Sequence, residues 1–147
     1  MDLFNSKEFN LNLPDSNITY YSDFLDPESA YRYFQIFLKE LNWQHHDITI
    51  FGKKIPQPRL TALYAINDLP YSYSNLTLIP EKFTPELLEI QQKLNVQTGK
   101  DFTHCLANFY RDGNDSMGWH SDDENALGID PVIASVSLGG VRNFQLK

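Results

Sequence analysis

The feature that most restricts the fold of this sequence is a change in hydrophobic period near Gly99. Before it, apolar residues recur every three or four positions in two stretches, which is typical of helices packed on a core. After it, residues 103–110 alternate, and residues 132–138 and 142–146 alternate again, which is typical of strands. Helices followed by strands predict an α+β fold, with helices packed against a β-sandwich or jelly roll.

Both predicted helices have clear start signals. Asp26 followed by Pro27, and Thr84 followed by Pro85, each combine a capping side chain with a proline suited to the first turn. The second helix is expected to end near Gly99, a residue that tolerates a left-handed backbone. The core-facing residues are expected to be Ala30, Phe34, Phe37, Leu38 and Leu41 in the first helix and Leu87, Ile90 and Leu94 in the second.

Shorter elements are expected between the two helices. Residues 47–51 and 60–64 predict strands, and residues 68–70 predict a turn. Residues 52–59 are expected to form a loop, because they hold two prolines that cannot donate to a ladder. In the later strand 103–110, alternation places four residues on one face: His104, Leu106, Asn108 and Tyr110.

Size, charge and cysteine content limit the class of protein. A length of 147 residues suits one domain, here taken as residues 1–147. The net charge of −7 argues against non-specific binding to duplex nucleic acid, so any nucleic-acid contact must be a local site. No apolar run reaches membrane-spanning length and no signal peptide opens the chain, which predicts no membrane association. The single cysteine, Cys105, excludes an intramolecular disulfide and favours a reducing, cytoplasmic location.

The most informative short motif is His120-Ser-Asp122. In an extended segment, residues two apart face the same way, so one imidazole and one carboxylate can bind a single ion. Two histidines and a carboxylate would leave positions open on iron(II) for a co-substrate and dioxygen. Alone, the motif also suits a surface turn rich in serine and aspartate.

A series of ordered motifs over residues 48–147 resembles the AlkB family of iron(II)- and 2-oxoglutarate-dependent dioxygenases, in its branch that repairs alkylated nucleic-acid bases. These motifs are Phe51-Gly-Lys53, Pro58-Arg59, Tyr64, Pro70-Tyr-Ser-Tyr-Ser74, Asn108-x-Tyr110, Asp112-Gly113, His120-Ser-Asp122-Asp123-Glu124, residues 131–139 and Arg142-x-Phe144. The resemblance implies a double-stranded β-helix, or jelly-roll, core with helices packed on it. It also implies iron(II) as cofactor and 2-oxoglutarate as co-substrate.

The resemblance assigns roles to individual residues. His120 and Asp122 match iron ligands and therefore the catalytic centre, and Asn108 and Tyr110 match residues that bind 2-oxoglutarate. The remaining matches concern the nucleic acid. They comprise a base contact (Asp123), a lid over a flipped base (Tyr71, Ser72, Tyr73), a finger loop that enters the base stack (Phe51, Gly52) and phosphate contacts (Lys53, Arg59).

The implied reaction is oxidative demethylation of alkylated bases in DNA or RNA, single-stranded or damaged bases costing least to extract. The family's second histidine ligand and its 2-oxoglutarate arginines lie further along, yet no histidine follows His120 and the only later arginine is Arg142. Because Lys147 follows a strand-like run, the last strands are expected to be missing. Two alternatives stay open: a non-catalytic nucleic-acid binder and a metal-binding jelly roll unrelated to bases. The oligomeric state is not indicated.

Overall fold

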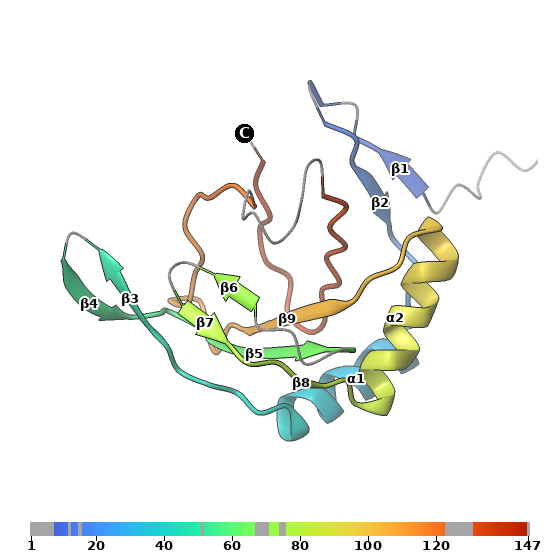
Figure 1. Ribbon diagram of the computed structural model, residues 1–147. Coiled ribbons are helices and arrows are strands. Elements are labelled where there is room, and N and C mark those ends of the chain that lie inside the picture. The colour runs from blue at the N-terminus through green and yellow to red at the C-terminus, as the bar shows by residue number, and fades with distance from the viewer. Residues whose placement is uncertain are drawn as a thin grey trace, which may run out of the picture. The chain divides into compact units, whose positions relative to one another are not determined.

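The computed structural model describes residues 8–11, 13–14, 16–50, 52–66, 71–73, 76–122 and 131–146. Contacts divide the chain into two compact units, Met1–Ile36 with Ser137–Lys147 and Phe37–Val136. The elements in chain order are β1 (Glu8–Asn10), β2 (Thr19–Tyr21), α1 (Pro27–Glu40), β3 (Asp47–Ile50), β4 (Lys53–Pro56), β5 (Leu60–Ala65), β6 (Tyr71–Tyr73), β7 (Leu76–Leu78), β8 (Glu81–Lys82), α2 (Pro85–Thr98) and β9 (His104–Phe109) (Figure 1).

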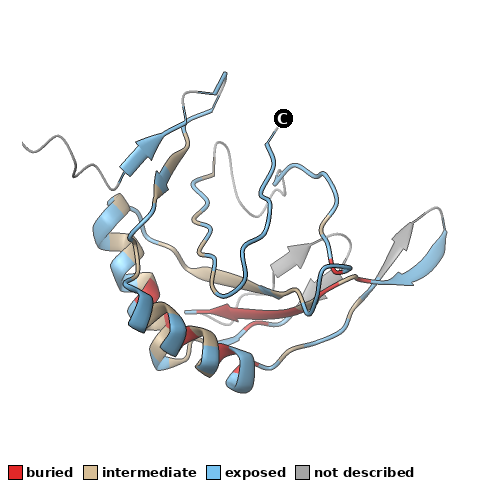
Figure 2. Ribbon diagram, turned by 180° about the vertical axis from the view of Figure 1, so that it is seen from behind, coloured by how far each residue is buried: buried red, intermediate tan, exposed pale blue. Residues whose placement is uncertain are grey.

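A three-stranded sheet in the order β8-β5-β9 forms the centre of the larger unit. Strand β9 pairs antiparallel with all of β5, from Leu60 opposite Phe109 to Ala65 opposite His104, and β8 pairs parallel with the end of β5. Because β5 has a neighbour on both sides, it is buried along almost its whole length (Figure 2). Helices together with mainly antiparallel strands confirm the α+β prediction in its coarse form; the single domain over residues 1–147 stays a prediction.

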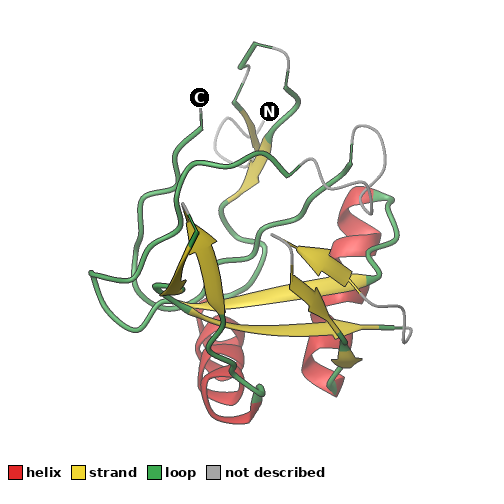
Figure 3. Ribbon diagram, turned by 60° about the vertical axis from the view of Figure 1, so that its left-hand side comes forward, coloured by secondary structure: helices red, strands yellow, loops and turns green. Residues whose placement is uncertain are grey.

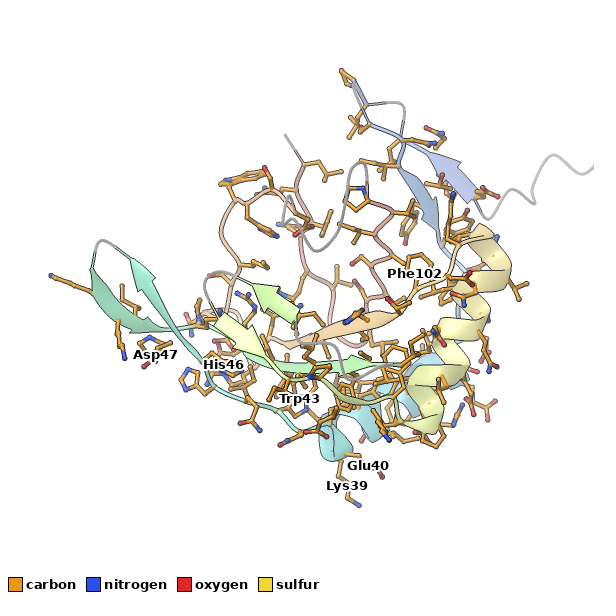
Figure 4. All side chains as sticks on the ribbon, in the orientation of Figure 1. Lys39, Glu40, Trp43, His46, Asp47 and Phe102 are labelled. Atoms are coloured by element: carbon orange, nitrogen blue, oxygen red, sulfur yellow. The ribbon has the colours of Figure 1, made fainter. Side chains whose placement is uncertain are left out.

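Helix α2 begins and ends as the sequence predicts. The Thr84 hydroxyl accepts a hydrogen bond from the Leu87 backbone N–H at 3.3 Å, and Gly99 ends the helix with a left-handed φ of 66°. Figure 1 shows α2 at the end of the sheet where β9 begins. The link between them is fixed at Phe102, labelled in Figure 4, whose backbone N–H donates to the Asn95 side chain and whose carbonyl accepts from the Gln91 amide.

The last turn of α1 and the segment after it pack under the sheet. Phe37 and Leu41 are buried, whereas Lys39 and Glu40 point away into solvent (Figure 4). The Trp43 indole N–H donates to the Phe37 carbonyl at 3.1 Å, and its ring lies 5.4 Å from the ring of Phe109 in β9. This aromatic contact joins the end of the helix to the strand that carries the candidate site.

For the core face of α1, one sequence prediction is wrong and one buried residue was not predicted. Leu38 is 38% exposed, although its spacing predicts a core position, and Tyr33 is buried at 7% exposure without having been predicted. The α1 stripe therefore runs through Tyr33, Phe37 and Leu41, four residues apart, which is the spacing of one helical face.

The prediction that residues 52–59 form a loop is wrong for Lys53–Pro56. These residues form β4, which pairs antiparallel with β3 from Ile50 opposite Lys53 to Asp47 opposite Pro56. Proline is tolerated there because it is the last residue of an edge strand in a two-stranded ladder, where the missing N–H interrupts nothing. Gly52 forms the turn with φ of 75°.

The predicted strands at residues 132–138 and 142–146 are also wrong. The structure assigns no strand to residues 131–146, which Figure 3 shows as loop. A period of two indicates a strand only if a neighbouring strand supplies the ladder. Within this segment the large apolar residues Val132, Ile133, Val141 and Phe144 are more than half exposed.

The smaller unit contains the β1–β2 hairpin and the start of α1. Phe9 pairs with Tyr20 across the hairpin, and their ring centroids are 6.3 Å apart. The start of α1 is capped as predicted, because the Asp26 carboxylate accepts from the Ser29 N–H at 2.9 Å and from the Ser29 hydroxyl at 2.6 Å. These hydrogen bonds hold the pKa of Asp26 below its ordinary value.

At Gly139, in the same unit, both the backbone conformation and a close neighbouring side chain restrict which residue can be accommodated. Its φ is 85°, and a Cβ built there would lie 2.8 Å from the Phe34 ring. We expect Gly139→Ala to destabilise the protein by about 1–3 kcal/mol, because it combines a strained backbone with overpacking. Urea denaturation measures this. Gly140→Ala is the matched control, since nothing lies within 4 Å of a Cβ there, and equal losses in both variants would contradict the prediction.

Neither helix in the described part of the chain has the length and apolar character needed to cross a membrane.

Candidate metal and cofactor site

Strand β9 separates a packed face from the face that carries the candidate cofactor residues. Phe109 contacts Trp43, whereas its neighbour Asn108 is exposed and meets the Arg59 side chain. Tyr110 follows directly after the strand and is half-buried. The alternation predicted for residues 103–110 therefore agrees with these contacts, since Asn108 and Phe109 face opposite ways.

Arg59 supports Asn108 instead of facing solvent. Its Nε donates to Asn108 Oδ1 at 2.8 Å, and the arginine is only 4% exposed. This corrects the expectation that Arg59 contacts phosphate, because a guanidinium buried against the sheet is not presented to a nucleic-acid backbone. The hydrogen bond fixes which end of the Asn108 amide is the acceptor, so the Nδ2 donor is directed away from Arg59. Sequence reasoning missed this pair because its members are 49 residues apart.

Cys105 lies half-buried in the same strand. Burial raises the pKa of its thiol to about 11, from an ordinary value of 9.0. A buried, protonated thiol is a poor nucleophile, which agrees with the interpretation of Cys105 as a small apolar residue and not a reactive one.

This pKa predicts a pH dependence of stability. The folded protein binds the thiol proton more tightly than the unfolded chain, so the stabilisation is complete below about pH 9 and is lost as pH rises toward 11. We expect the free energy of unfolding to fall by up to about 3 kcal/mol over this range. Because tyrosines and lysines titrate there too, the measurement is the difference between wild type and Cys105→Ala. An unchanged difference from pH 8.5 to 11 would contradict the prediction.

The loop after β9 is closed by a salt bridge between Arg111 and Asp115. One carboxylate oxygen of Asp115 accepts from the Arg111 backbone N–H at 2.8 Å and from its Nε at 2.7 Å, and the other accepts from its Nη2 at 2.8 Å. These hydrogen bonds to Asp115 raise the pKa of Arg111. The Ser116 N–H then donates to the Pro58 carbonyl at 2.9 Å, which attaches the loop to the segment before β5.

His120 and Asp122 come together at the far end of this loop. His120 Nε2 lies 3.2 Å from Asp122 Oδ1, and both side chains are partly exposed. His120 Nδ1 lies 2.9 Å from the Gly118 carbonyl, an acceptor that favours a proton on Nδ1. Nε2 faces Asp122 Oδ1, so a proton or a metal ion can lie between them, and a metal ligand would have its other nitrogen held by a backbone carbonyl in this way.

The donor set fits two positions of an iron(II) site. One imidazole nitrogen and one carboxylate oxygen converge, as the family's facial arrangement requires. The described residues contain no group of three histidine, cysteine, aspartate or glutamate side chains placed for one metal ion. The site seen here is therefore a half-site of two ligands.

The predicted nucleic-acid residues fall into two groups. Gly52 lies at the tip of the β3–β4 hairpin and Lys53 begins β4, exposed, as a protruding finger would require. Tyr71, Ser72 and Tyr73 form β6, paired with β7 from Tyr71 opposite Leu78 to Tyr73 opposite Leu76. Phe51 and Asp123 lie outside the described residues.

Residues 17–147 match the sequence profile of the family described as "2OG-Fe(II) oxygenase superfamily". The match covers the sheet, the Arg59–Asn108 pair and the His120–Asp122 half-site. This chain belongs to the 2OG-Fe(II) oxygenase superfamily. Within this oxygenase superfamily, the resemblance to the AlkB family is confirmed by the curated relatives.

The oxygenase chain is similar to "Alpha-ketoglutarate-dependent dioxygenase alkB homolog 3" of Rattus norvegicus, with 39% identity over 138 residues, covering 90% of this chain and 44% of the relative. The protein of the same name from Homo sapiens is 36% identical over 133 residues, covering 90% and 46%. "DNA oxidative demethylase ALKBH2" of Bos taurus is 40% identical over 100 residues, covering 68% and 36%. The chain thus spans less than half the length of these relatives.

Proposed function

We propose that this chain forms part of the active site of an iron(II)- and 2-oxoglutarate-dependent dioxygenase that demethylates alkylated bases in DNA or RNA. The observation that carries the proposal is the His120–Asp122 pair, 3.2 Å apart, with Nδ1 of the imidazole held by a backbone carbonyl. Relatives named as dioxygenases and as a DNA oxidative demethylase support the reaction class.

In this proposal, His120 Nε2 and Asp122 Oδ1 hold iron(II), and Asn108 and Tyr110 bind 2-oxoglutarate. With dioxygen, the bound iron(II) and 2-oxoglutarate would supply the chemistry that hydroxylates an alkyl group on a base nitrogen, and the product would lose that group as an aldehyde. Arg59 keeps the Asn108 amide oriented, and the Gly118 carbonyl keeps the His120 ring in the binding tautomer. The protein's own part is thus to position these donors.

The nucleic acid is proposed to bind along the hairpins. Gly52 and Lys53, with Phe51, form the finger that replaces a flipped base in its stack, and Tyr71, Ser72 and Tyr73 form the lid over it. Asp123 contacts the base. A net charge of −7 leaves little general attraction for phosphate, so single-stranded or damaged substrate is expected to be preferred over intact duplex.

We further propose that the described sheet belongs to a jelly-roll core in one cytoplasmic domain without membrane contact. The sequence has no histidine after His120, so His120 and Asp122 are the ligands this chain contributes by the family's order. The family match over residues 17–147 supports the jelly roll.

The test is consumption of 2-oxoglutarate by the purified chain with iron(II), ascorbate and a methylated single-stranded oligonucleotide, followed as succinate formed and methyl groups lost. The same oligonucleotide without methyl groups, and reactions without iron, are the controls. Turnover that needs both iron and the methyl group supports the proposal. Oligonucleotide binding without any turnover would favour a non-catalytic binder, and metal binding without oligonucleotide affinity would favour a module unrelated to bases.

A further inference from the structure

The loop between β9 and the metal half-site has one buried charged group, the carboxylate of Asp115. The residue is 5% exposed, whereas Asp112, Asn114 and Ser116 around it are exposed. An ionised carboxylate removed from water is costly unless it is fully hydrogen-bonded. A buried charge in the middle of an otherwise exposed loop therefore indicates that the loop has one required conformation.

Three hydrogen bonds to the Asp115 carboxylate come from one residue, Arg111. The backbone N–H and Nε of Arg111 donate to one carboxylate oxygen at 2.8 and 2.7 Å, and its Nη2 donates to the other at 2.8 Å. Two parallel side-chain bonds plus one backbone bond fix both the distance and the orientation of the carboxylate. The turn from Arg111 to Asp115 starts two residues after β9 ends. It is therefore closed by hydrogen bonds between its own first and last residues.

A second hydrogen bond connects this turn to the segment that holds the side chain of Asn108. The Ser116 N–H, next to Asp115, donates to the Pro58 carbonyl at 2.9 Å. Pro58 is bonded to Arg59, and Arg59 Nε bonds Asn108 at 2.8 Å. The start of the His120 segment and the side chain of Asn108 are thus both attached to Pro58 and Arg59.

We propose that Asp115 is a positioning residue that sets the path of residues 116–122, and so the place of the His120–Asp122 half-site relative to Asn108. This inference rests on the proposed function for the identity of the half-site. Asp115 contacts neither metal nor substrate; it acts through Arg111 and through the Ser116–Pro58 hydrogen bond. Without the Arg111–Asp115 and Ser116–Pro58 hydrogen bonds, His120 and Asp122 lie at the end of an unrestrained loop. Bringing them together on an ion then costs more conformational entropy.

The experiment compares wild type with Asp115→Asn and Arg111→Ala, and adds Arg111→Lys, which keeps the charge but not the fork. Asp112→Asn is the matched control, because Asp112 Oδ1 accepts from the Asn114 N–H in the same turn and an asparagine oxygen can do the same. Three quantities are measured on the whole chain: the dissociation constant of Mn²⁺ by electron paramagnetic resonance, hydrogen exchange at the amides of Arg111 and Ser116, and the melting temperature.

We expect Asp115→Asn and Arg111→Ala to raise the Mn²⁺ dissociation constant about tenfold and to accelerate exchange at Ser116. Arg111→Lys should recover part of the affinity, and Asp112→Asn should stay within about twofold of wild type. If Asp115→Asn does not fold, the arginine variants decide alone. A lower melting temperature with unchanged Mn²⁺ affinity would assign Asp115 a purely structural role and overturn the inference while leaving the proposed function intact. Failure of the wild type to bind Mn²⁺ would instead overturn the metal half-site itself.

Discussion

Replacing His120 with alanine is expected to reduce 2-oxoglutarate turnover on methylated oligonucleotide by at least about a hundredfold. Loss of a partner that only orients a metal ligand already costs about 10–100-fold, and His120 is proposed as the ligand itself. Its Nε2 is the only imidazole nitrogen beside Asp122 in the described site, at 3.2 Å from Oδ1. Mn²⁺ binding should be lost in parallel, since a single carboxylate is a weak site.

The control is His46→Ala. His46 contributes its backbone carbonyl to the Gln57 N–H, a hydrogen bond that alanine preserves, and it lies at the base of the β3–β4 hairpin (Figure 4). That variant should retain turnover within about twofold, the range of ordinary surface changes. If His120→Ala is as active as His46→Ala, the half-site has been assigned to the wrong residues.

Replacing Arg59 with alanine is expected to raise the KM for 2-oxoglutarate about tenfold, with a smaller change in kcat. The substitution removes the donor to Asn108 Oδ1 and leaves the amide only a long hydrogen bond, from Nδ2 to the Leu106 carbonyl at 3.4 Å, among those the structure shows, so its orientation is less fixed. A lost hydrogen bond to a charged group is worth about 1.5–3 kcal/mol, and 1.4 kcal/mol corresponds to tenfold in binding. Steady-state kinetics with varied 2-oxoglutarate at saturating oligonucleotide measure the effect.

Two further variants make this prediction specific. Lys54→Ala removes an exposed cation from the neighbouring β4 and should leave the KM for 2-oxoglutarate unchanged. Arg59→Lys keeps a charged donor and should lie between wild type and Arg59→Ala. An increase in the KM for oligonucleotide but not for 2-oxoglutarate in Arg59→Ala would return Arg59 to the phosphate-contact role that its buried position argues against.

The parts of the fold that depend on local chemistry could be predicted from the sequence. The start of α1 at Asp26 and both ends of α2, at Thr84 and Gly99, follow from capping groups within a few residues of one another. Strand β4 was missed because Pro56 was treated as a breaker, whereas its effect depends on whether it lies at a sheet edge. The strands predicted at residues 132–138 and 142–146 are absent because alternation shows which faces differ, but not whether a partner strand is present.

For the candidate site the division is similar. His120 and Asp122 are two residues apart, so their proximity follows from spacing alone. The Arg111–Asp115 salt bridge also had a signal, an arginine and an aspartate four residues apart in a loop rich in turn-forming residues, although it was not recognised. The contact between Arg59 and Asn108 had none, because it depends on the register that places β5 beside β9.

Among the described residues, the backbone hydrogen bonds that join the β3–β4 hairpin to the rest of its unit lie near its base. There, the Gln57 N–H donates to the His46 carbonyl, and Gln44 and Thr61 exchange two backbone hydrogen bonds, whereas β3 and β4 form a sheet of two strands. A two-stranded ribbon of this kind contributes little to the stability of the central sheet. The hairpin's length and the sequence at its tip can therefore vary between related proteins without loss of the central sheet. Gln44 and Thr61 mark the positions at which one such hairpin could be replaced by another.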